Sequence, residues 1–397
     1  MNLALIKTVV VGLNGALQKR FVLGDQTDLI PGNVHRASEL QTGVGGKGQD
    51  VAVTLGCLEY SGGMQLAQFV GSGAEGDVVY QMLEELLGDE AMGLTVRTES
   101  GMRTCTSIVG SDTTTELVEP SGVIAESEMN DLMAKLEGVQ ADALCIMGSM
   151  PPGCADETYA DIYSTVATPN TLCLIDSVVG LEPLLKAVAK VGGPTILKVN
   201  ASELCRLANV SKTSSEAGGV QPTELVHAIS AFLDHFTDAT QSLSAIAVTD
   251  GAHPGYLAVL PVADEDEFRL FQMPVAKLSE PSKGWFSGKS SSRTTTLYPI
   301  GAGDAVAGGT LAAWTALTQQ QPNLVHPQVA AALSGNEKPQ SRAMLAAFGF
   351  GLACGSASCR QEQNSVLKVS DALELYRQVG RPMFLSSHKT TKTSTMR

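Results

Sequence analysis

The sequence predicts an α/β protein: a doubly wound, mainly parallel β-sheet with helices on both faces and a small β-lid. Short, almost continuous apolar runs alternate with helix-length segments, as expected for strands buried on both faces of a parallel sheet. Such alternation is typical of strand–helix–strand units. Two stretches, residues 19–39 and 96–119, break the alternation and are rich in Thr, Val and charged residues, which favours antiparallel strands.

The apolar runs are the predicted strands, and the longer segments that separate them are predicted helices. In chain order the strands are Thr8–Leu13, Gln65–Val70, Ala143–Met147, Leu172–Ile175, Thr195–Val199 and Ala245–Val248. The helices include Asp77–Leu87, Ala155–Ala167, Leu181–Val191 and Pro222–Phe236. The two stretches that break the pattern would form a small flap, the predicted lid, over one end of the sheet.

The chain of 397 residues is long enough to bury a large core, and we expect a single domain over residues 1–382. Residues 279–296 are rich in Ser, Thr, Gly and Lys, and residues 319–341 carry Gln- and Pro-containing loop sequences. We predict that both are loop insertions. The Thr-, Ser- and Lys-containing end, residues 383–397, is predicted to be a disordered tail.

Charge and cysteine content exclude several classes of function. With 27 basic and 41 acidic residues the formal charge is −14, which repels phosphate backbones and anionic lipids, so we expect no nucleic-acid or membrane partner. The eight cysteines form no C-x-x-C pair and the six histidines show no metal-ligand spacing, so buried free thiols in a reducing compartment are expected. No apolar run is long enough to span a bilayer. These features predict a soluble, cytoplasmic protein.

Two glycine-rich motifs suggest phosphate-binding loops but fit them poorly. Residues 71–76 match the G-x-G-x-x-G pattern of dinucleotide-binding proteins, yet they belong to the second strand–helix unit. Residues 284–290 are one residue short of a P-loop, and no strand precedes them. We interpret the first motif as a strand-to-helix turn and the second as part of a loop.

A third glycine-rich turn is the strongest functional signal. Gly301-Ala302-Gly303-Asp304 precedes a run of small apolar residues, 305–314, that predicts a buried helix. The free N–H groups and the dipole of a helix start attract anions, and glycine lets the backbone approach a phosphoryl group. We interpret Asp304 as the base that accepts a proton from an attacking hydroxyl, and the N–H groups of Ala302 to Asp304 as an anion hole. The structural alternative is that Asp304 only caps the helix.

A fourth turn, Gly45-Gly46-Lys47-Gly48, also opens a predicted helix and carries a cation. It is either an ordinary flexible turn or a binding site. As a binding site, its backbone would face a polyhydroxyl substrate, and Lys47 would meet a phosphate.

Six segments in the same order give the chain its resemblance to a known family. They are Val11–Leu17, Gly45–Gly48, Thr115–Pro120, Gly148–Gly153, Lys198–Leu204 and Gly301–Asp304. In these segments the chain resembles the ribokinase-like (PfkB) carbohydrate kinases, and most of all their branch of 1-phosphofructokinases and tagatose-6-phosphate kinases. The match extends from about Thr8 to about Leu375, outside the insertions. It implies a ribokinase-like kinase fold and an ATP-dependent transfer of phosphate to a sugar or sugar phosphate.

The resemblance also implies roles for individual residues. Asp304 would be the catalytic base, with Gly301, Ala302 and Gly303 as the anion hole. Asn200 and Glu203, with Lys198 in the same motif, would organise ATP and Mg²⁺, and Glu203 would contact the metal through water. Thr249 and Gly251 would border the nucleotide, and residues 349–356, with Gly355, would form part of the adenine pocket. The substrate residues would be Asn14, Gln18, Arg36, Gly45, Gly46, Lys47, Asp50 and Arg103.

This chain departs from the family pattern in the substrate pocket. Gln18 stands where an aspartate is usual, and Asp50 stands where an asparagine is usual. The two changes would compensate if the carboxylate has moved from one side of the pocket to the other. Cys105 replaces a polar lid residue and Pro299 replaces a threonine before the catalytic turn, so these positions put the identity of the substrate in doubt.

Three functions therefore remain open. The first is a phosphosugar kinase, which the lid motif 115–120, Arg36 and Arg103 favour because Arg binds phosphate bidentately. The second is a kinase of an unphosphorylated sugar or a nucleoside. The third is a non-catalytic protein that binds sugar or nucleotide and regulates a partner, which the altered Gln18 and Asp50 would allow. Family lids of this kind often pair, so a homodimer through the lid is expected.

Overall fold

The computed structural model describes residues 7–24, 28–58, 63–110, 113–211, 219–237, 239–261, 266–278, 297–318, 338–379 and 381–389. Its strands are β1 Thr8–Val11, β2 Ala16–Leu23, β3 Ala37–Gly45, β4 Met64–Ser72, β5 Thr95–Gly101, β6 Thr104–Val109, β7 Thr114–Val118, β8 Ala143–Met147, β9 Leu172–Asp176, β10 Thr195–Asn200, β11 Leu243–Thr249, β12 Gly255–Val259, β13 Glu267–Met273 and β14 Met383–Lys389. Its α-helices are α1 Lys47–Cys57, α2 Gly73–Leu87, α3 Glu126–Leu136, α4 Thr158–Val166, α5 Leu181–Val191, α6 Ala201–Leu207, α7 Pro222–His235, α8 Ala302–Thr318, α10 Pro339–Ser358 and α11 Val369–Gln378; a short 3₁₀ helix, η1, covers Asp89–Met92.

The large sheet has ten strands in the order β14-β13-β12-β11-β10-β9-β8-β1-β4-β5. Strands β11 to β5 in this order pair in parallel, whereas β12, β13 and β14 are antiparallel to their neighbours. This confirms the predicted mainly parallel sheet. The chain winds outward from β1 to β4 and β5, and later from β8 towards β11, so the winding direction reverses between β1 and β8. Ligands of doubly wound folds bind at such a switch point, outside the carboxyl ends of the strands.

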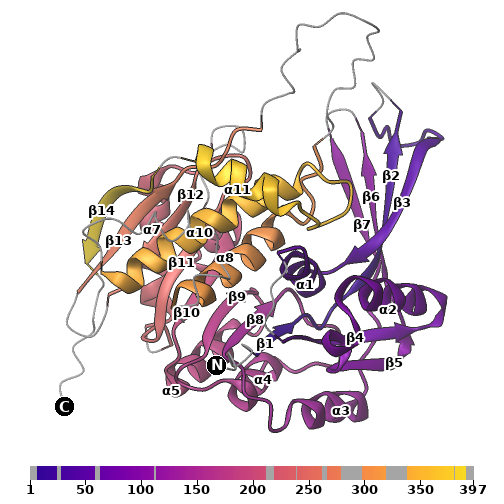
Figure 1. Ribbon diagram of the computed structural model, residues 1–397, viewed down its shortest axis with the longest axis horizontal. Coiled ribbons are helices and arrows are strands. Elements are labelled where there is room, and N and C mark those ends of the chain that lie inside the picture. Colours follow the sequence, from indigo (N-terminus) through magenta and orange to yellow (C-terminus); the bar gives the residue numbers. More distant parts are fainter. Residues whose placement is uncertain are drawn as a thin grey trace, which may run out of the picture.

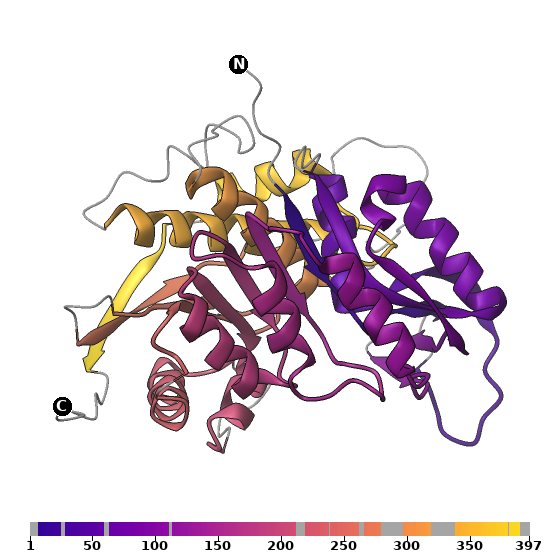
Figure 2. The ribbon, with the colours of Figure 1, turned by 90° about the horizontal axis from the view of Figure 1, so that it is seen from below.

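Helices cover both faces of this sheet, as the sequence predicts (Figure 2). Helices α3 to α7 pack their apolar sides on one face, in a core that includes Leu132, Ile162 and Phe232. Helices α1, α2, α8, α10 and α11 cover the other face, in two cores that include Trp314 and Leu55. The strands between the layers are buried on both sides; Val9, Val10 and Val11 of β1 are each at most 1% exposed. No helix in the described part of the chain is both long and apolar enough to cross a bilayer.

The small sheet stands apart from the large one and has the order β3-β2-β6-β7 (Figure 1). It confirms the predicted lid, with two corrections. Strand β2 pairs in parallel with β6, although its pairing with β3 is antiparallel. Residues 96–101, which were assigned to the lid from the sequence, instead belong to β5 at the edge of the large sheet beside β4. Several residues of this strand are buried, and it contacts α3 and α2.

The predicted disordered tail is wrong for residues 383–389. These residues form β14, which pairs with β13 along its length, and the ring of Phe384 lies 5.6 Å from that of Phe271. The backbone pairing with β13 and this ring contact keep the segment ordered, although its Ser and Thr content alone predicts disorder. The predicted insertion at 319–341 is also too long, because α10 starts at Pro339. Residues 279–296, with their P-loop-like motif, and residues 390–397 lie outside the described residues.

The G-x-G-x-x-G motif at residues 71–76 is a strand-to-helix turn, as predicted. It joins β4 to α2. A Cβ atom on Gly76 would lie 1.8 Å from the carbonyl oxygen of Gly71, so these glycines let the helix start pack against the strand end. Close packing thus accounts for the motif.

Candidate active site

A cavity of about 550 Å³ lies between the small sheet and the carboxyl ends of β1, β8 and β9. It is at the switch point of the large sheet. Of the predicted site residues, those that line it are Asn14, Gln18, Gly46, Lys47, Asp50, Arg103, Glu203, Gly301 and Asp304. These residues come from five separate parts of the sequence, so the fold brings together most of the predicted substrate and catalytic positions.

The glycine turn before α8 has the conformation that its glycine requires. Gly301 has φ +81°, and a Cβ atom there would lie 2.6 Å from the Oγ atom of Ser365. Helix α8 begins at Ala302 and is buried from Ala305 onward, as predicted. Asp304 is the third residue of α8, inside its first turn, so the interpretation of Asp304 as the N-cap residue is wrong.

The first N–H groups of α8 are only partly free. The N–H of Ala302 donates to the carbonyl of Pro299 at 3.1 Å, and the N–H of Asp304 donates to the carbonyl of Gly301 at 3.1 Å. Within the described residues, the N–H of Gly303 has no hydrogen-bond partner in the structure. Gly303 is also exposed. The amide best disposed to meet an anion at this helix start is therefore that of Gly303.

The Asp304 carboxyl group is held in an unusual state of ionisation. Burial, followed by the negative charge of Asp176, raises the pKa of Asp304 to about 7, although Lys198 and Lys47 act in the opposite direction. A general base works best when its pKa lies near the pH at which it operates. The environment of Asp304 therefore suits proton transfer near neutral pH.

Asp176, at the end of β9, pairs with both lysines of the site. Lys47 Nζ lies 2.7 Å from Asp176 Oδ1, and Lys198 Nζ donates to Asp176 Oδ2. Burial opposes the ionisation of Asp176, but Lys198 and Lys47 outweigh it and hold the pKa of Asp176 below its usual range. Lys47 also lies 3.5 Å from Glu203 Oε1. The carboxylate of Asp176 thus fixes the direction of both ammonium groups.

The Gly45–Gly48 turn places α1 against the end of β1 with no space for side chains. A Cβ atom on Gly48 would lie 2.3 Å from Gly12 Cα, and Gly46 has φ +118°. Gln49 donates to the carbonyl of Gly12 at 2.8 Å. This close contact positions Lys47, the first residue of α1, at the cavity.

The small sheet supplies one wall of the cavity through alternate residues of its strands. Gln18, Cys105, Glu116 and Val118 line it. The register pairs Gln18 with Cys105 and Cys105 with Val118, and directly paired residues share one face of a sheet. The amide of Gln18 donates to Ser107 Oγ at 2.7 Å, so this side chain is held against the sheet.

Asp50 lies in α1 beside Asp304 and is 5% exposed. Burial, and then the negative charge of Asp304, raise the pKa of Asp50 well above its usual range. Its carboxyl group also makes a hydrogen bond with Ser365. The raised pKa makes the neutral form of Asp50 more accessible, and that form can donate a hydrogen bond as the amide of the usual asparagine does.

Asn14 and Arg103 form the far end of the cavity. Asn14 donates to Ser149 Oγ at 3.0 Å and accepts from Ser121 Oγ at 2.8 Å. Arg103 donates from Nε to the carbonyl of Gly15 at 3.2 Å and from Nη2 to the carbonyl of Asn14 at 2.7 Å. These bonds fix one edge of the guanidinium and leave its Nη1 group available to a ligand.

Glu203 is held at the cavity by a capping box at the start of α6. Asn200 Oδ1 accepts the N–H of Glu203 at 2.8 Å, and Glu203 Oε2 accepts the N–H of Asn200 at 2.9 Å. The described residues contain no group of three or more His, Cys, Asp or Glu side chains suited to a metal. Glu203, as a single carboxylate, fits Mg²⁺ that keeps most of its waters and binds mainly to phosphate groups.

Nine of the eighteen predicted site residues do not line this cavity: Gly45, Ala302, Gly303, Lys198, Asn200, Arg36, Thr249, Gly251 and Gly355. Arg36 is exposed just before β3. Thr249, which pairs with Asn200, ends β11 two residues before Gly251. Gly355 lies inside α10, where a Cβ atom would come within 2.8 Å of the carbonyl oxygen of Ala302, so it packs α10 against the first turn of α8. The nucleotide roles of the last three residues stay predictions.

Asp176, Ser149 and Asn364 line or hold the site and were absent from the sequence prediction. Asp176 had a readable signal, because it is an acidic residue directly after a buried parallel strand, where ligand sites of such sheets lie. Ser149 sits in one of the six family-like segments. Asn364 carries no such signal, since it belongs to an irregular connection between α10 and α11.

Residues 15–252 match the pfkB family of carbohydrate kinases. Two tagatose-6-phosphate kinases from Staphylococcus epidermidis are 28% and 27% identical to the chain over 184 residues, which are 46% of this chain and 56% of each relative. The chain thus spans about half the length of the curated relatives it matches.

Solved structures resemble the chain over nearly all of its length. Phosphofructokinase-2 from Escherichia coli, solved with potassium, superposes with a TM-score of 0.61 at 20% identity and covers 95% of this chain and 99% of its own. A possible 1-phosphofructokinase from Thermotoga maritima gives 0.61 at 17% identity, covering 96% and 100%; ribokinase from the same organism gives 0.57 at 15%, covering 94% and 99%. At these identities the likeness shows a shared fold. Since the family match itself extends over more than half of the sequence, the chain belongs to the pfkB family of carbohydrate kinases.

Proposed function

We propose that the protein is an ATP-dependent kinase that phosphorylates a hydroxyl group of a sugar phosphate, as a 1-phosphofructokinase or tagatose-6-phosphate kinase does. One observation carries this proposal: the carboxyl group of Asp304, with a pKa of about 7, faces a cavity that also contains Lys47 and Arg103. Membership of a carbohydrate kinase family and the two tagatose-6-phosphate kinase relatives support the same reaction.

In the proposed mechanism the acceptor hydroxyl lies between Asp304 and the γ-phosphate of ATP. Its oxygen bonds to the γ-phosphorus while its proton passes to Asp304 Oδ, and ADP leaves with the electron pair of the broken P–O bond. The N–H of Gly303 and the ammonium of Lys47 stabilise the negative charge on the transferring group. The small sheet closes the cavity and limits the access of water, which would otherwise compete with the sugar.

Glu203 would hold an ATP-bound Mg²⁺ through water, and the ion would supply positive charge to the phosphates. Asp176 is unsuited to that role because two lysines already neutralise it. Lys198 and Asn200 are on β10, which leads directly into α6 and Glu203. We place the nucleotide near the end of β11 and the start of α8, close to Thr249, Gly251 and Gly355.

The phosphate of the substrate is assigned to the end of the cavity that contains Arg103 and Ser149. Arg103 has a fixed guanidinium with Nη1 available, which suits one oxygen of a phosphate. Asn14, Gln18 and Asp50 would contact the hydroxyl groups of the sugar. Arg36 contributes nothing to this cavity within one chain.

An ADP-release screen tests the proposal against fructose 1-phosphate, fructose 6-phosphate, tagatose 6-phosphate, fructose, ribose and adenosine. We expect turnover with a sugar phosphate. Asp304→Asn should lower kcat by roughly 10²–10⁴-fold, the contribution of a general base, and should still bind ATP. ATP binding without turnover of any acceptor would instead favour a regulatory binder.

A second set of variants tests the substrate class. Arg103→Ala should raise KM for the phosphorylated sugar far more than KM for its dephosphorylated analogue; equal effects would favour the unphosphorylated substrate. Asp50→Asn and Gln18→Asp test whether the two positions compensate for each other. Compensation is rejected if Asp50→Asn leaves the KM for the substrate unchanged and Gln18→Asp lowers it.

We also propose a cytoplasmic location, because the eight free cysteines favour a reducing compartment.

We further propose a homodimer that pairs through the outer face of the small sheet. That face carries Phe21, Leu40, Ile108 and Leu117, and Leu40 and Leu117 are 55% and 58% exposed. A structure of Escherichia coli phosphofructokinase-2 is described as tetrameric. Leu117→Glu should give monomers in light scattering, whereas Val78→Glu, on the exposed side of α2, should not; a wild-type monomer would reject this interface.

A further inference from the structure

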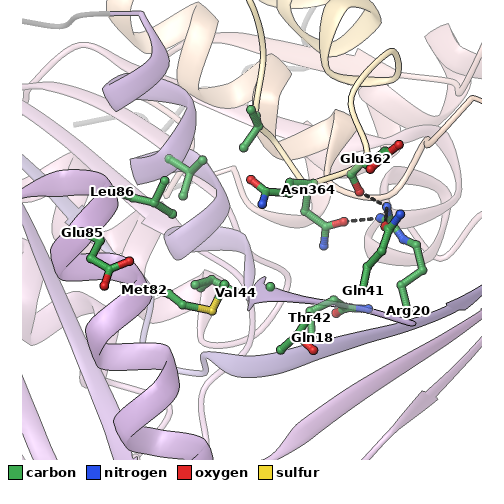
Figure 3. Close-up of a pocket in the computed structure, with 14 residues that line it drawn as sticks. Gln18, Arg20, Gln41, Thr42, Val44, Met82, Glu85, Leu86, Glu362 and Asn364 are labelled. Carbon is green, nitrogen blue, oxygen red and sulfur yellow. Dashed lines mark hydrogen bonds between the residues drawn. The ribbon is translucent and has the colours of Figure 1, made fainter. Parts of the chain in front are cut away.

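A second cavity, of about 570 Å³, lies beside the first one, between the small sheet, helices α1 and α2, and the segment 362–366 (Figure 3). Gln18 and Asn364 line both cavities. In Figure 3, Met82 and Leu86 of α2 face Asn364 and Arg20 across this space. The small sheet and the segment 362–366 are therefore separated here by a cavity, and Arg20 spans its edge.

Arg20, on β2, is 3% exposed and joins the small sheet to the C-terminal part of the chain. Its Nη1 donates to the carbonyl of Glu362, and its Nη2 lies 2.5 Å from Asn364 Oδ1. Its guanidinium carbon is 5.1 Å from the centre of the Tyr298 ring. Among the described residues, no other hydrogen bond connects the four strands of the small sheet to the chain after residue 297.

The segment that Arg20 holds is in direct contact with the catalytic turn. Ser365 Oγ donates to the carbonyl of Gly301 at 2.8 Å, and the same carbonyl accepts the N–H groups of Asp304 at 3.1 Å and of Ala305 at 2.9 Å. Thr54 of α1 donates to the carbonyl of Ser365 at 3.0 Å. Because Gly301 has no space for a side chain beside Ser365, a shift of Ser365 must move the turn that orients Asp304.

We propose that Arg20 is a positioning residue that couples the small sheet to the catalytic turn through Asn364 and Ser365. The planar guanidinium holds two acceptors in one fixed arrangement, which a lysine ammonium cannot reproduce. When the sheet lies over the cavity, Arg20 fixes the segment 362–365, and this segment fixes the carbonyl of Gly301. The effect on turnover rests on the proposed kinase function, while the effect on the turn itself does not.

Hydrogen–deuterium exchange and steady-state kinetics on Arg20→Met, Arg20→Lys and a control variant test this coupling. Methionine fills a similar volume but donates no hydrogen bond. In Arg20→Met we expect exchange of the amides in residues 298–305 to increase about 10-fold or more, and kcat to fall about 10- to 100-fold, the cost of a misplacement of the reacting groups by about 1 Å. The KM for ATP should stay unchanged. In Arg20→Lys we expect smaller changes than in Arg20→Met, both in the exchange of residues 298–305 and in kcat.

Arg269→Met is the matched control. Arg269 also donates to a side chain, Ser341 Oγ at 3.0 Å, and lies 6.0 Å from the Phe271 ring, but it is on β13, far from the catalytic turn along the sheet. It should change neither exchange at 298–305 nor kcat. Wild-type exchange at 298–305 in a folded Arg20→Met protein would overturn the coupling, even if kcat falls. If Arg20→Met does not fold, wild-type exchange at residues 298–305 in Arg20→Lys would equally overturn the coupling. If the wild-type protein phosphorylates no acceptor, the exchange measurements alone test the coupling.

Discussion

Asp304 shows how neighbouring charges at the scale of single residues set the chemistry of the site. Its half-buried carboxyl group lies near Asp176, which is itself paired with Lys47 and Lys198. The sequence identified Asp304 and Lys47 from their turns, because turns have local signatures. It could not identify the pairing of Asp176 with two lysines, which depends on β9, β10 and α1 lying side by side.

The rate of the proposed reaction should follow the ionisation of Asp304. A base must be ionised to accept a proton, so kcat/KM should rise with pH around the pKa of about 7 and level off above it. In Asp176→Asn the negative charge that raises the pKa of Asp304 is removed, and Lys47 and Lys198 lose their partner. The midpoint of the pH–rate profile should therefore move to lower pH.

The control for this prediction is Asp77→Asn, which breaks an ion pair with Arg97 at the surface and should leave the midpoint unchanged. Because Asp176→Asn leaves Lys198 buried without its carboxylate, thermal unfolding must first show that the variant is folded. If the midpoint stays at the wild-type pH in folded Asp176→Asn, the ionisation of Asp304 does not cause the fall of kcat/KM at low pH.

At the scale of elements, close contacts between glycines place the helices that carry functional residues. The sequence correctly predicted that the turn at 45–48 opens a helix and that 301–304 precedes a buried one. It did not predict β12 and β13, which continue the large sheet in antiparallel fashion beyond β11. An antiparallel extension depends on pairing with a strand that is already in place, and the residues of β12 and β13 do not by themselves show which strand they will pair with.

The contact between α1 and β1 should tolerate no side chain at Gly48. In Gly48→Ala the new methyl group would meet Gly12 Cα at 2.3 Å, which forces α1 away from β1 and displaces Lys47. We expect a loss of stability of about 1–3 kcal/mol, the usual cost of overpacking, together with a higher KM for the sugar. Urea unfolding and steady-state kinetics measure the two effects.

Gly56→Ala provides the matched control in the same helix. Its new methyl group would meet the flexible end of Leu87 at 3.2 Å, and alanine is favoured over glycine inside helices by about 1 kcal/mol. Stability and KM should therefore be unchanged or slightly improved. If Gly48→Ala behaves in the same way as Gly56→Ala, the close contact does not position Lys47.

At the scale of the whole molecule, the site and the sheet edge have different roles. The cavity lies at the ends of β1, β8 and β9, whereas β14 is the outermost strand at the opposite side of the order from β5. In Figure 1, β14 and β13 lie at the far side of the molecule from the small sheet. The edge should therefore contribute to stability and solubility without affecting catalysis.

Truncation after Pro382 tests this separation. It removes β14, exposes the backbone of β13 and the Phe271 ring, and leaves a free sheet edge that can pair with other chains. We expect Tm to fall by about 1–2 °C, the shift that about 1 kcal/mol causes in a chain of this length, and aggregation to increase, while KM and kcat of soluble protein stay at wild-type values. Altered kinetics at unchanged Tm would contradict the assignment of β14 to the edge.

The amino-acid sequence by itself determined the fold class and the glycine turns at 45–48 and 301–304, because periodicity, glycine turns and helix starts are local properties of the chain. The resemblance to the family added other residues that line the cavity, such as Asn14, Arg103 and Glu203. Only the tertiary structure decided which groups share charges and hydrogen bonds: Asp176 with Lys47 and Lys198, Asp50 beside Asp304, and Arg20 with the segment 362–365. It also placed residues 383–389, which were expected to belong to a disordered tail, in β14. These outcomes depend on strands and loops that are far apart in the sequence and meet only when the sheet is assembled, and no local pattern encodes such a meeting.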